Sequence, residues 1–121
     1  MRPPKPWERY LALLKVETPL TYRMTLAEDG SAHTGDKVFT IGFPVPEFLG
    51  TEGKYSEGVI SALSGIQGAA NVMQITTQIQ PGNSGGPLVD TNGHVIGIVT
   101  STAAAGAFLD TAGTLPQNIN W

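Results

Sequence analysis

Cysteine is absent from this 121-residue chain, which excludes disulfide bonds and thiolate metal sites and leaves the compartment open. Histidine is scarce as well, because His33 and His94 are the only two, and they share no ligand spacing with the scattered carboxylates. We therefore expect no metal site. Charged residues make up only 14% of the chain, the formal net charge is −3, and no run of Lys or Arg occurs. A nucleic-acid partner is therefore not expected.

Long apolar runs are also absent. No stretch approaches the ~20 residues that a membrane-spanning helix needs, so we expect no membrane partner. Residues 1–10 contain three prolines and lack the apolar centre of a secretory signal peptide, and the localisation stays unknown. Neither a GxGxxG motif nor a P-loop occurs, so we expect no nucleotide and no other cofactor.

Hydrophobic residues nevertheless make up 40% of the chain, which is enough for the ordered core of one domain. Short segments rich in β-branched and aromatic residues alternate with turns, and Asn92-Gly93 is a strong hairpin signal. Gly58 inside a strand predicts a β-bulge. The pattern predicts a closed antiparallel barrel or sandwich with almost no helix. The expected strands are Leu11–Val16, Lys37–Gly42, Tyr55–Leu63, Val72–Ile79, Pro87–Val89, His94–Thr100 and Gln117–Trp121.

The most informative stretch is Pro81–Val89, PGNSGGPLV, which places one serine between glycines ahead of an apolar run. Glycine permits backbone conformations that a Cβ would forbid, so Ser84 is expected on a tight turn with its Oγ exposed. Side chains at Gly82 and Gly86 are expected to strain that turn through φ > 0. The amides of Gly82 and Ser84 then point into one small space, as the oxyanion of an acyl-transfer intermediate requires. An ordinary Gly-rich hairpin is the alternative.

Gly82–Leu88, GNSGGPL, resembles the nucleophile loop of trypsin-like serine proteases, most closely the HtrA/Deg-like bacterial branch, which is often found in the bacterial envelope or periplasm. Further segments resemble parts of that family in the same order, over roughly residues 10–121. This collinearity makes the resemblance specific. The segments are Leu11–Val16, Gly35–Pro44, Ser56–Leu63, Gln74–Gln80, Asn92–Val99 and Pro116–Trp121.

The resemblance implies an all-β fold, a six-stranded antiparallel Greek-key barrel that corresponds to the second barrel of a trypsin-like protease. Its last strand is expected to be truncated at Trp121, and one strand of a missing first barrel is expected to precede it. The implied division is an unstructured N-terminal extension over 1–9, the last first-barrel strand and inter-barrel connector over 10–35, and the nucleophile-bearing barrel over 36–121.

The resemblance also implies the roles of the site residues. Ser84 is the expected nucleophile of a serine endopeptidase, and the backbone amides of Gly82 and Ser84 are the expected oxyanion hole. The expected substrate is a peptide or protein with a small or medium apolar side chain at the cleavage site, because no acid lies at the base of the implied pocket. That these residues form only the barrel rim is the alternative. The expected pocket residues are Gln78, Ile79, Gln80, Val99, Thr100 and Ser101.

Two catalytic partners of the serine have no counterpart here. The family's catalytic histidine precedes every matching segment, and Tyr10 stands at the position of its aspartate. A serine hydroxyl needs a base, and a tyrosine cannot orient an imidazole as a carboxylate does. His33 and His94 map to barrel ends remote from the cleft, so either would serve Ser84 only across chains. We expect a protease fragment that is inactive alone; the alternative is a non-catalytic, self-assembling or binding β-domain.

The apolar segment Leu11–Val16 corresponds to a strand whose barrel is not expected in this chain. An unpaired apolar strand is a template for pairing with another chain. We therefore expect a homo-oligomer that forms through Leu11, Leu13, Leu14 and Val16. The alternative is that this strand folds back onto its own barrel.

Overall fold

The computed structural model describes residues 12–43, 50–64 and 72–100. All regular secondary structure in these ranges is β, and within them no helix is long and apolar enough to cross a membrane. The strands are β1 (Lys37–Gly42), β2 (Lys54–Ala62), β3 (Gln74–Ile75), β4 (Pro87–Asp90) and β5 (Val95–Ile98).

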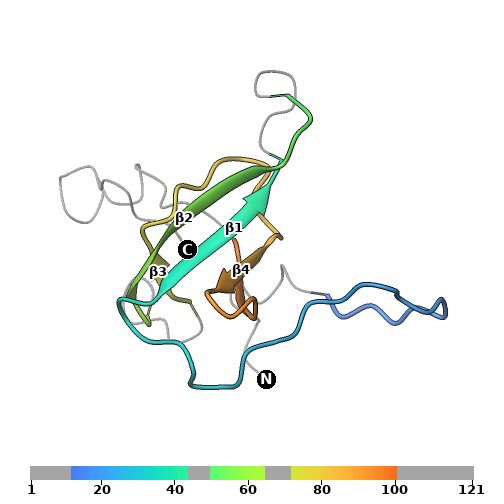
Figure 1. Ribbon diagram of the computed structural model, residues 1–121, viewed down its shortest axis with the longest axis horizontal. Helices are drawn as coiled ribbons and strands as arrows, with labels where there is room; N and C mark the ends of the chain where they lie inside the picture. The colour runs from blue at the N-terminus through green and yellow to red at the C-terminus, as the bar shows by residue number, and fades with distance from the viewer. Residues whose placement is uncertain (1–11, 44–49, 65–71, 101–121) are drawn as a thin grey trace, which may run out of the picture.

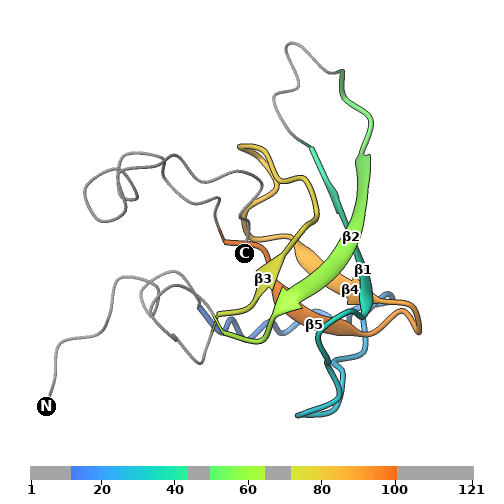
Figure 2. The same cartoon turned by 90° about the vertical axis from the view of Figure 1, so that its left-hand side faces the viewer.

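The strands form one antiparallel sheet in the order β3-β2-β1-β4-β5. β1 and β2 are its long central pair, and the sheet curls as β3 and the β4–β5 hairpin turn away from them (Figures 1 and 2). This all-β half-barrel confirms the fold class expected from the sequence. The strand expected over Gln117–Trp121 lies outside the described residues.

One face of the sheet carries the core. Val38 and Thr40 alternate with Phe39 and Ile41 along β1, so the first pair is buried and the second lies on the opposite face. Burying an aliphatic side chain of this size contributes about 1.5–3 kcal/mol. Thr40 is tolerated there because its Oγ1 donates a 2.7 Å hydrogen bond to the carbonyl of Pro87. The core consists of Val38, Ile60, Ile75, Ile79, Leu88 and Val99.

The hairpin between β4 and β5 follows the expected Asn-Gly turn. Gly93 has φ 81°, the left-handed conformation that glycine adopts without strain. The Asp90 carboxylate closes the turn by accepting hydrogen bonds from the amides of Asn92 and His94, each 2.9 Å long. The hairpin prediction is thus confirmed.

Gly58 does not form the expected bulge. It pairs with Val38 in an uninterrupted β1–β2 register, and the irregularity in β2 lies between Ile60 and Ala62, opposite β3. A Cβ on Gly58 would lie 2.5 Å from the backbone nitrogen of Thr77. Glycine is therefore needed at this position because the backbone of Thr77 approaches it closely, and not because the strand bulges.

The third expected strand is shorter than its sequence pattern. Only Gln74–Ile75 of the expected Val72–Ile79 lies in the ladder. Burial still alternates beyond it, because Ile75, Thr77 and Ile79 are buried while the residues between them are exposed. The alternation of burial thus continues toward the nucleophile loop beyond the paired residues, although the backbone bends at Thr77.

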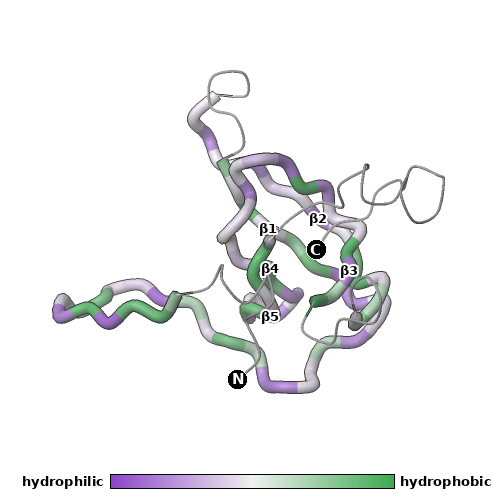
Figure 3. Tube along the Cα trace, turned by 180° about the vertical axis from the view of Figure 1, so that it is seen from behind, coloured by the Kyte–Doolittle hydropathy of each residue, from purple (hydrophilic) through white to green (hydrophobic). Residues whose placement is uncertain are grey.

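Residues 12–24, which we call the arm, differ from the expectation of a paired strand. Every one of them is exposed, and residues 12–16 belong to no strand; Leu11 lies outside the described residues. The arm joins the sheet only beyond its end, where the Val95 amide donates to the Thr25 carbonyl and the Ala27 amide donates to the Val95 carbonyl. Figures 1 and 3 show it projecting from the body of the molecule and turning back on itself. It does not fold back onto the described barrel.

Candidate active site

The stretch PGNSGG folds as two consecutive tight turns. The Asn83 amide donates to the Gln80 carbonyl at 3.0 Å, and the Gly86 amide donates to the Asn83 carbonyl at 3.0 Å. The third residue of each turn is a glycine with positive φ, 103° at Gly82 and 87° at Gly85. Positive φ at that position is what a type II turn requires. The glycines on both sides of the serine are therefore demanded by the backbone.

Gly86 is constrained by space and not by φ, which corrects the sequence expectation. It is not among the glycines with positive φ. A Cβ on it would lie 3.0 Å from the Asn83 carbonyl oxygen, and one on Gly42, at the end of β1, would lie 2.8 Å from Asn83 Oδ1. The loop therefore packs directly on the end of β1.

Ser84 is exposed, and its hydroxyl donates a 3.0 Å hydrogen bond to the carbonyl of Thr100. Its loop is joined to the strand that leaves β5 by two backbone bonds. The Gly85 amide donates to the Val99 carbonyl at 2.7 Å, and the Val99 amide donates to the Gly86 carbonyl at 2.9 Å. The serine is thus held in a defined place with its oxygen still able to accept a hydrogen bond.

The amides of the loop divide into two groups. Those of Asn83, Gly85 and Gly86 donate hydrogen bonds within the chain. Those of Gly82 and Ser84 donate to no acceptor among the described residues. These are the two amides that the sequence analysis singled out.

Both histidines lie at the other end of the sheet. His33 belongs to the turn before β1, where its amide donates to Asp36 Oδ2 at 2.8 Å and its Nδ1 lies 3.7 Å from the same oxygen. His94 closes the β4–β5 turn beside Asp90. From His94 to Thr100, which binds Ser84, an extended chain covers about 20 Å at ~3.3 Å per residue. Neither histidine is therefore placed to take the Ser84 proton within one chain.

The expected pocket residues flank Ser84 with mixed burial. Gln78, Gln80 and Thr100 are exposed, whereas Ile79 and Val99 belong to the core. Ser101 lies outside the described residues. Among residues 12–43, 50–64 and 72–100, no group of three or more His, Cys, Asp or Glu side chains could hold a metal ion.

Sequence reasoning missed Asn83 and Gly42. Asn83 is 2% exposed, and its Oδ1 is buried with no hydrogen-bond partner in the part of the chain that the structure describes, beside the space that the missing side chain of Gly42 leaves. The only signal in the sequence was an asparagine within a glycine-rich loop. Asparagine is common in turns, so this signal did not mark the residue as special. Their contact joins residues distant in sequence, so the local pattern did not predict it.

Comparison with known proteins agrees with this arrangement. A family model described as a trypsin-like peptidase domain matches residues 3–98. The magnetosome formation protease MamE of Paramagnetospirillum magneticum is 40% identical over 116 residues, which cover 89% of this chain and 15% of that protein. The serine protease Do-like HtrB of Bacillus subtilis is 39% identical over 98 residues, which cover 73% of this chain and 21% of that protein.

Solved structures give the same result. The serine endoprotease from Yersinia pestis has a TM-score of 0.57 and 32% identity, over 80% of this chain and 29% of that one. The HtrA-type protease AlgW, solved with a decapeptide, has a TM-score of 0.56 and 31% identity, over 80% of this chain and 28% of that one. The chain thus spans less than a third of the length of these relatives. With its half-barrel and its GNSGGP loop, it belongs to the trypsin-like peptidase family, on the HtrA-type branch.

Proposed function

We propose that this chain supplies the nucleophile and the oxyanion hole of a serine endopeptidase. The observation that carries the proposal is the state of the loop. Ser84 is exposed at its centre, and the amides on either side of Asn83, those of Gly82 and Ser84, have no acceptor among the described residues. Two donors beside an exposed hydroxyl suit acyl transfer, in which negative charge develops on a carbonyl oxygen.

In this proposal the Ser84 oxygen attacks the carbonyl carbon of a peptide bond, and the carbonyl electron pair moves onto its oxygen. The amides of Gly82 and Ser84 donate to that oxyanion; losing one such donor typically costs about 2.7–4 kcal/mol of transition-state stabilisation. The carbon–nitrogen bond then breaks, the amine leaves with a proton, and water hydrolyses the acyl ester. The resting hydrogen bond to Thr100 must open first, because it holds the proton that a base must remove.

The base has to come from outside the described residues. Because His33 and His94 lie at the far end of the sheet, the chain alone is proposed to be inactive or nearly so. A site that keeps its oxyanion hole but lacks its base retains only about 10³–10⁴-fold acceleration over water in the best-studied case. The proposed substrate is a peptide or protein, with a small or medium apolar side chain beside Gln80 and Thr100.

A second candidate is a non-catalytic, self-assembling β-domain. The exposed arm favours it, because Leu13 and Leu14 are almost fully exposed and Val16 is 55% exposed. Contiguous apolar exposure of this kind marks an interface. We propose self-association through Leu11, Leu13, Leu14 and Val16, which is compatible with either function.

A fluorophosphonate probe separates the two functions. The full chain and Ser84→Ala are incubated with the probe, and labelling is followed by intact mass. Slow labelling that disappears in Ser84→Ala is expected for a serine held beside an oxyanion hole. Equal silence from both proteins, under conditions that label an active HtrA-type protease, would favour the non-catalytic domain.

A further inference from the structure

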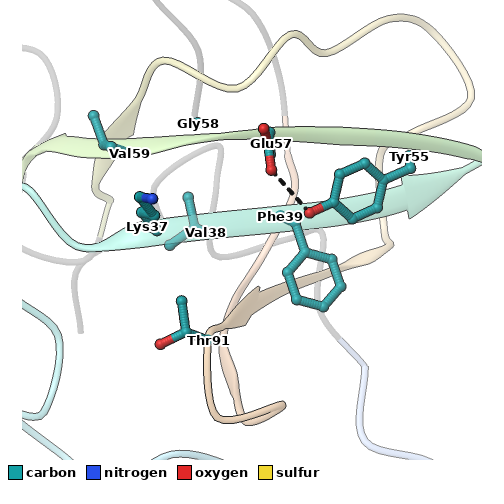
Figure 4. Close-up of a pocket in the computed structure, with 8 residues that line it drawn as sticks. All are labelled: Lys37, Val38, Phe39, Tyr55, Glu57, Gly58, Val59 and Thr91. Carbon is teal, nitrogen blue, oxygen red and sulfur yellow. Dashed lines mark hydrogen bonds between the residues drawn. The ribbon is translucent and has the colours of Figure 1, made fainter.

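The outer face of β1 and β2, opposite the core, carries a hollow of about 360 Å³, which we call the outer hollow (Figure 4). The antiparallel register places Lys37 opposite Val59 and Phe39 opposite Glu57, so these side chains share one face of the sheet. The lining residues are Lys37, Val38, Phe39, Tyr55, Glu57, Gly58, Val59 and Thr91.

The outer hollow is lined by two aromatic rings and by two side chains of opposite charge. Of these two, only the carboxylate has a partner among the described residues. The rings of Phe39 and Tyr55 stack with centroids 5.4 Å apart. The Tyr55 hydroxyl donates to Glu57 Oε2 at 3.0 Å, and this hydrogen bond, together with burial and the Glu57 charge, raises the pKa of Tyr55. The Tyr55 hydroxyl is therefore the donor that holds the carboxylate in place. Lys37 has no ion pair among the described residues.

The arm presents a matching sequence. No residue of the arm makes a hydrogen bond or ion pair with a described residue. Residues 12–16 adopt no regular secondary structure, and a bend follows at Glu17 and Thr18, which must straighten for residues 13–17 to bind as one extended segment. In an extended chain Leu13, Lys15 and Glu17 point to one side, with neighbours about 6.6 Å apart.

Three side chains on the outer face of β1 and β2 follow one another at the same spacing as these three arm residues. Tyr55 and Glu57 follow each other on β2, and Lys37 lies at the next level, opposite Val59. Successive levels are about 6.6 Å apart along a strand. The arm therefore offers an apolar, a cationic and an anionic side chain in that order. The sheet offers complementary side chains, which are aromatic, anionic and cationic, in the same order and at the same spacing.

A copy's own arm is not placed to fill its own hollow. The arm joins the sheet beside β5, whereas the outer hollow lies on β1 and β2, beyond β4 in the strand order. Figures 1 and 3 show the arm running away from that pair of strands. An arm bound in the outer hollow would therefore belong to another copy.

We propose that residues 13–17 of one copy bind in the outer hollow of a second copy. The arm runs parallel to β2, and the contacts are Leu13 on Tyr55, Lys15 on Glu57 and Glu17 on Lys37. The proposal rests on the self-association proposed above and assigns a receptor surface to Leu13, whereas Leu14 and Val16, which alternate with it, lie on the other side of the arm. It does not depend on Ser84.

Charge reversal tests the pairing by sedimentation equilibrium of the full chain. Lys15→Glu and Glu57→Lys are each expected to weaken association about tenfold, because each turns one interfacial pair repulsive. Lys15→Glu combined with Glu57→Lys is expected to restore it to within about threefold, since attraction returns with reversed signs. Glu28→Lys, an exposed residue outside the outer hollow, is the control for the change in net charge.

Cross-linking supplies a second measurement, because the native chain has no cysteine. Leu13→Cys mixed with Tyr55→Cys is expected to form mixed disulfide dimers on mild oxidation, whereas Leu13→Cys mixed with Glu28→Cys is not. The assignment would be overturned if neither single charge reversal weakened association, or if the double variant did not restore it. Self-association itself would still stand in either case. A monomer at tens of micromolar would overturn both, and Ser84 labelling would still report on catalysis.

Discussion

A single methyl group at the end of β1 is expected to disturb the nucleophile loop. The Cβ of Gly42→Ala would lie 2.8 Å from Asn83 Oδ1, 2.9 Å from its Cγ and 3.2 Å from its Cα. The last contact is with backbone, so rotating the side chain does not relieve it. Overpacking of this kind typically costs about 1–3 kcal/mol. Urea unfolding followed by circular dichroism measures that loss.

Gly97→Ala is the matched control, because it also adds one methyl group within the sheet. Its nearest new neighbour, Met73 Cε, would be 3.6 Å away, which is ordinary contact. We expect this variant to keep its stability or gain slightly, since alanine replaces glycine inside a strand. Gly42→Ala combined with Asn83→Ala is expected to recover part of the loss, because two of the three close contacts disappear. If Gly42→Ala were as stable as Gly97→Ala, the packing of the loop on β1 would be refuted.

Three further outcomes are expected. Ser84→Ala should change the free energy of unfolding by less than about 0.5 kcal/mol, as an exposed position allows, whereas Gly86→Val should lower it by about 1–3 kcal/mol through overpacking; equal melting temperatures would contradict a space-limited turn. Asp90→Ala should destabilise the hairpin by about 1–2 kcal/mol, because two turn amides lose their acceptor, and Thr91→Ala, scanned in parallel, should not. The purified chain should release no measurable peptide from casein; robust cleavage that Ser84→Ala abolishes would show that a base is present after all.

Local sequence patterns were sufficient where neighbouring residues determine the structure. The aromatic and β-branched residues of Lys37–Gly42 predicted a strand, and Asn92-Gly93 predicted the hairpin turn. The glycines around Ser84 predicted tight turns. Each of these depends on φ, ψ and side-chain period within a few residues, which a short window of sequence contains.

Local patterns failed where a distant segment decides the outcome. A glycine within a strand suggests a bulge, but Gly58 instead lies against the Thr77 backbone. At Gly86 a side chain is excluded by the Asn83 carbonyl oxygen and not by the φ angle of Gly86 itself. Leu13 and Leu14 have the apolar character of a strand but no partner among the described residues. A strand exists only when paired, so propensity alone did not decide its formation.

The two backbone bonds between the nucleophile loop and Val99 also govern how the loop moves. Gly85 and Gly86 hold both polar groups of Val99, so the loop cannot separate from that strand without breaking both bonds. Amides that open in one cooperative event share one free energy of opening, and hence one protection factor against exchange with solvent deuterium. The Gly85 and Val99 amides are therefore expected to have the same protection factor. The mobility of Ser84 is then set by the strand that contains Val99. A ligand that makes this strand more rigid would reduce the motion of the loop without contacting Ser84.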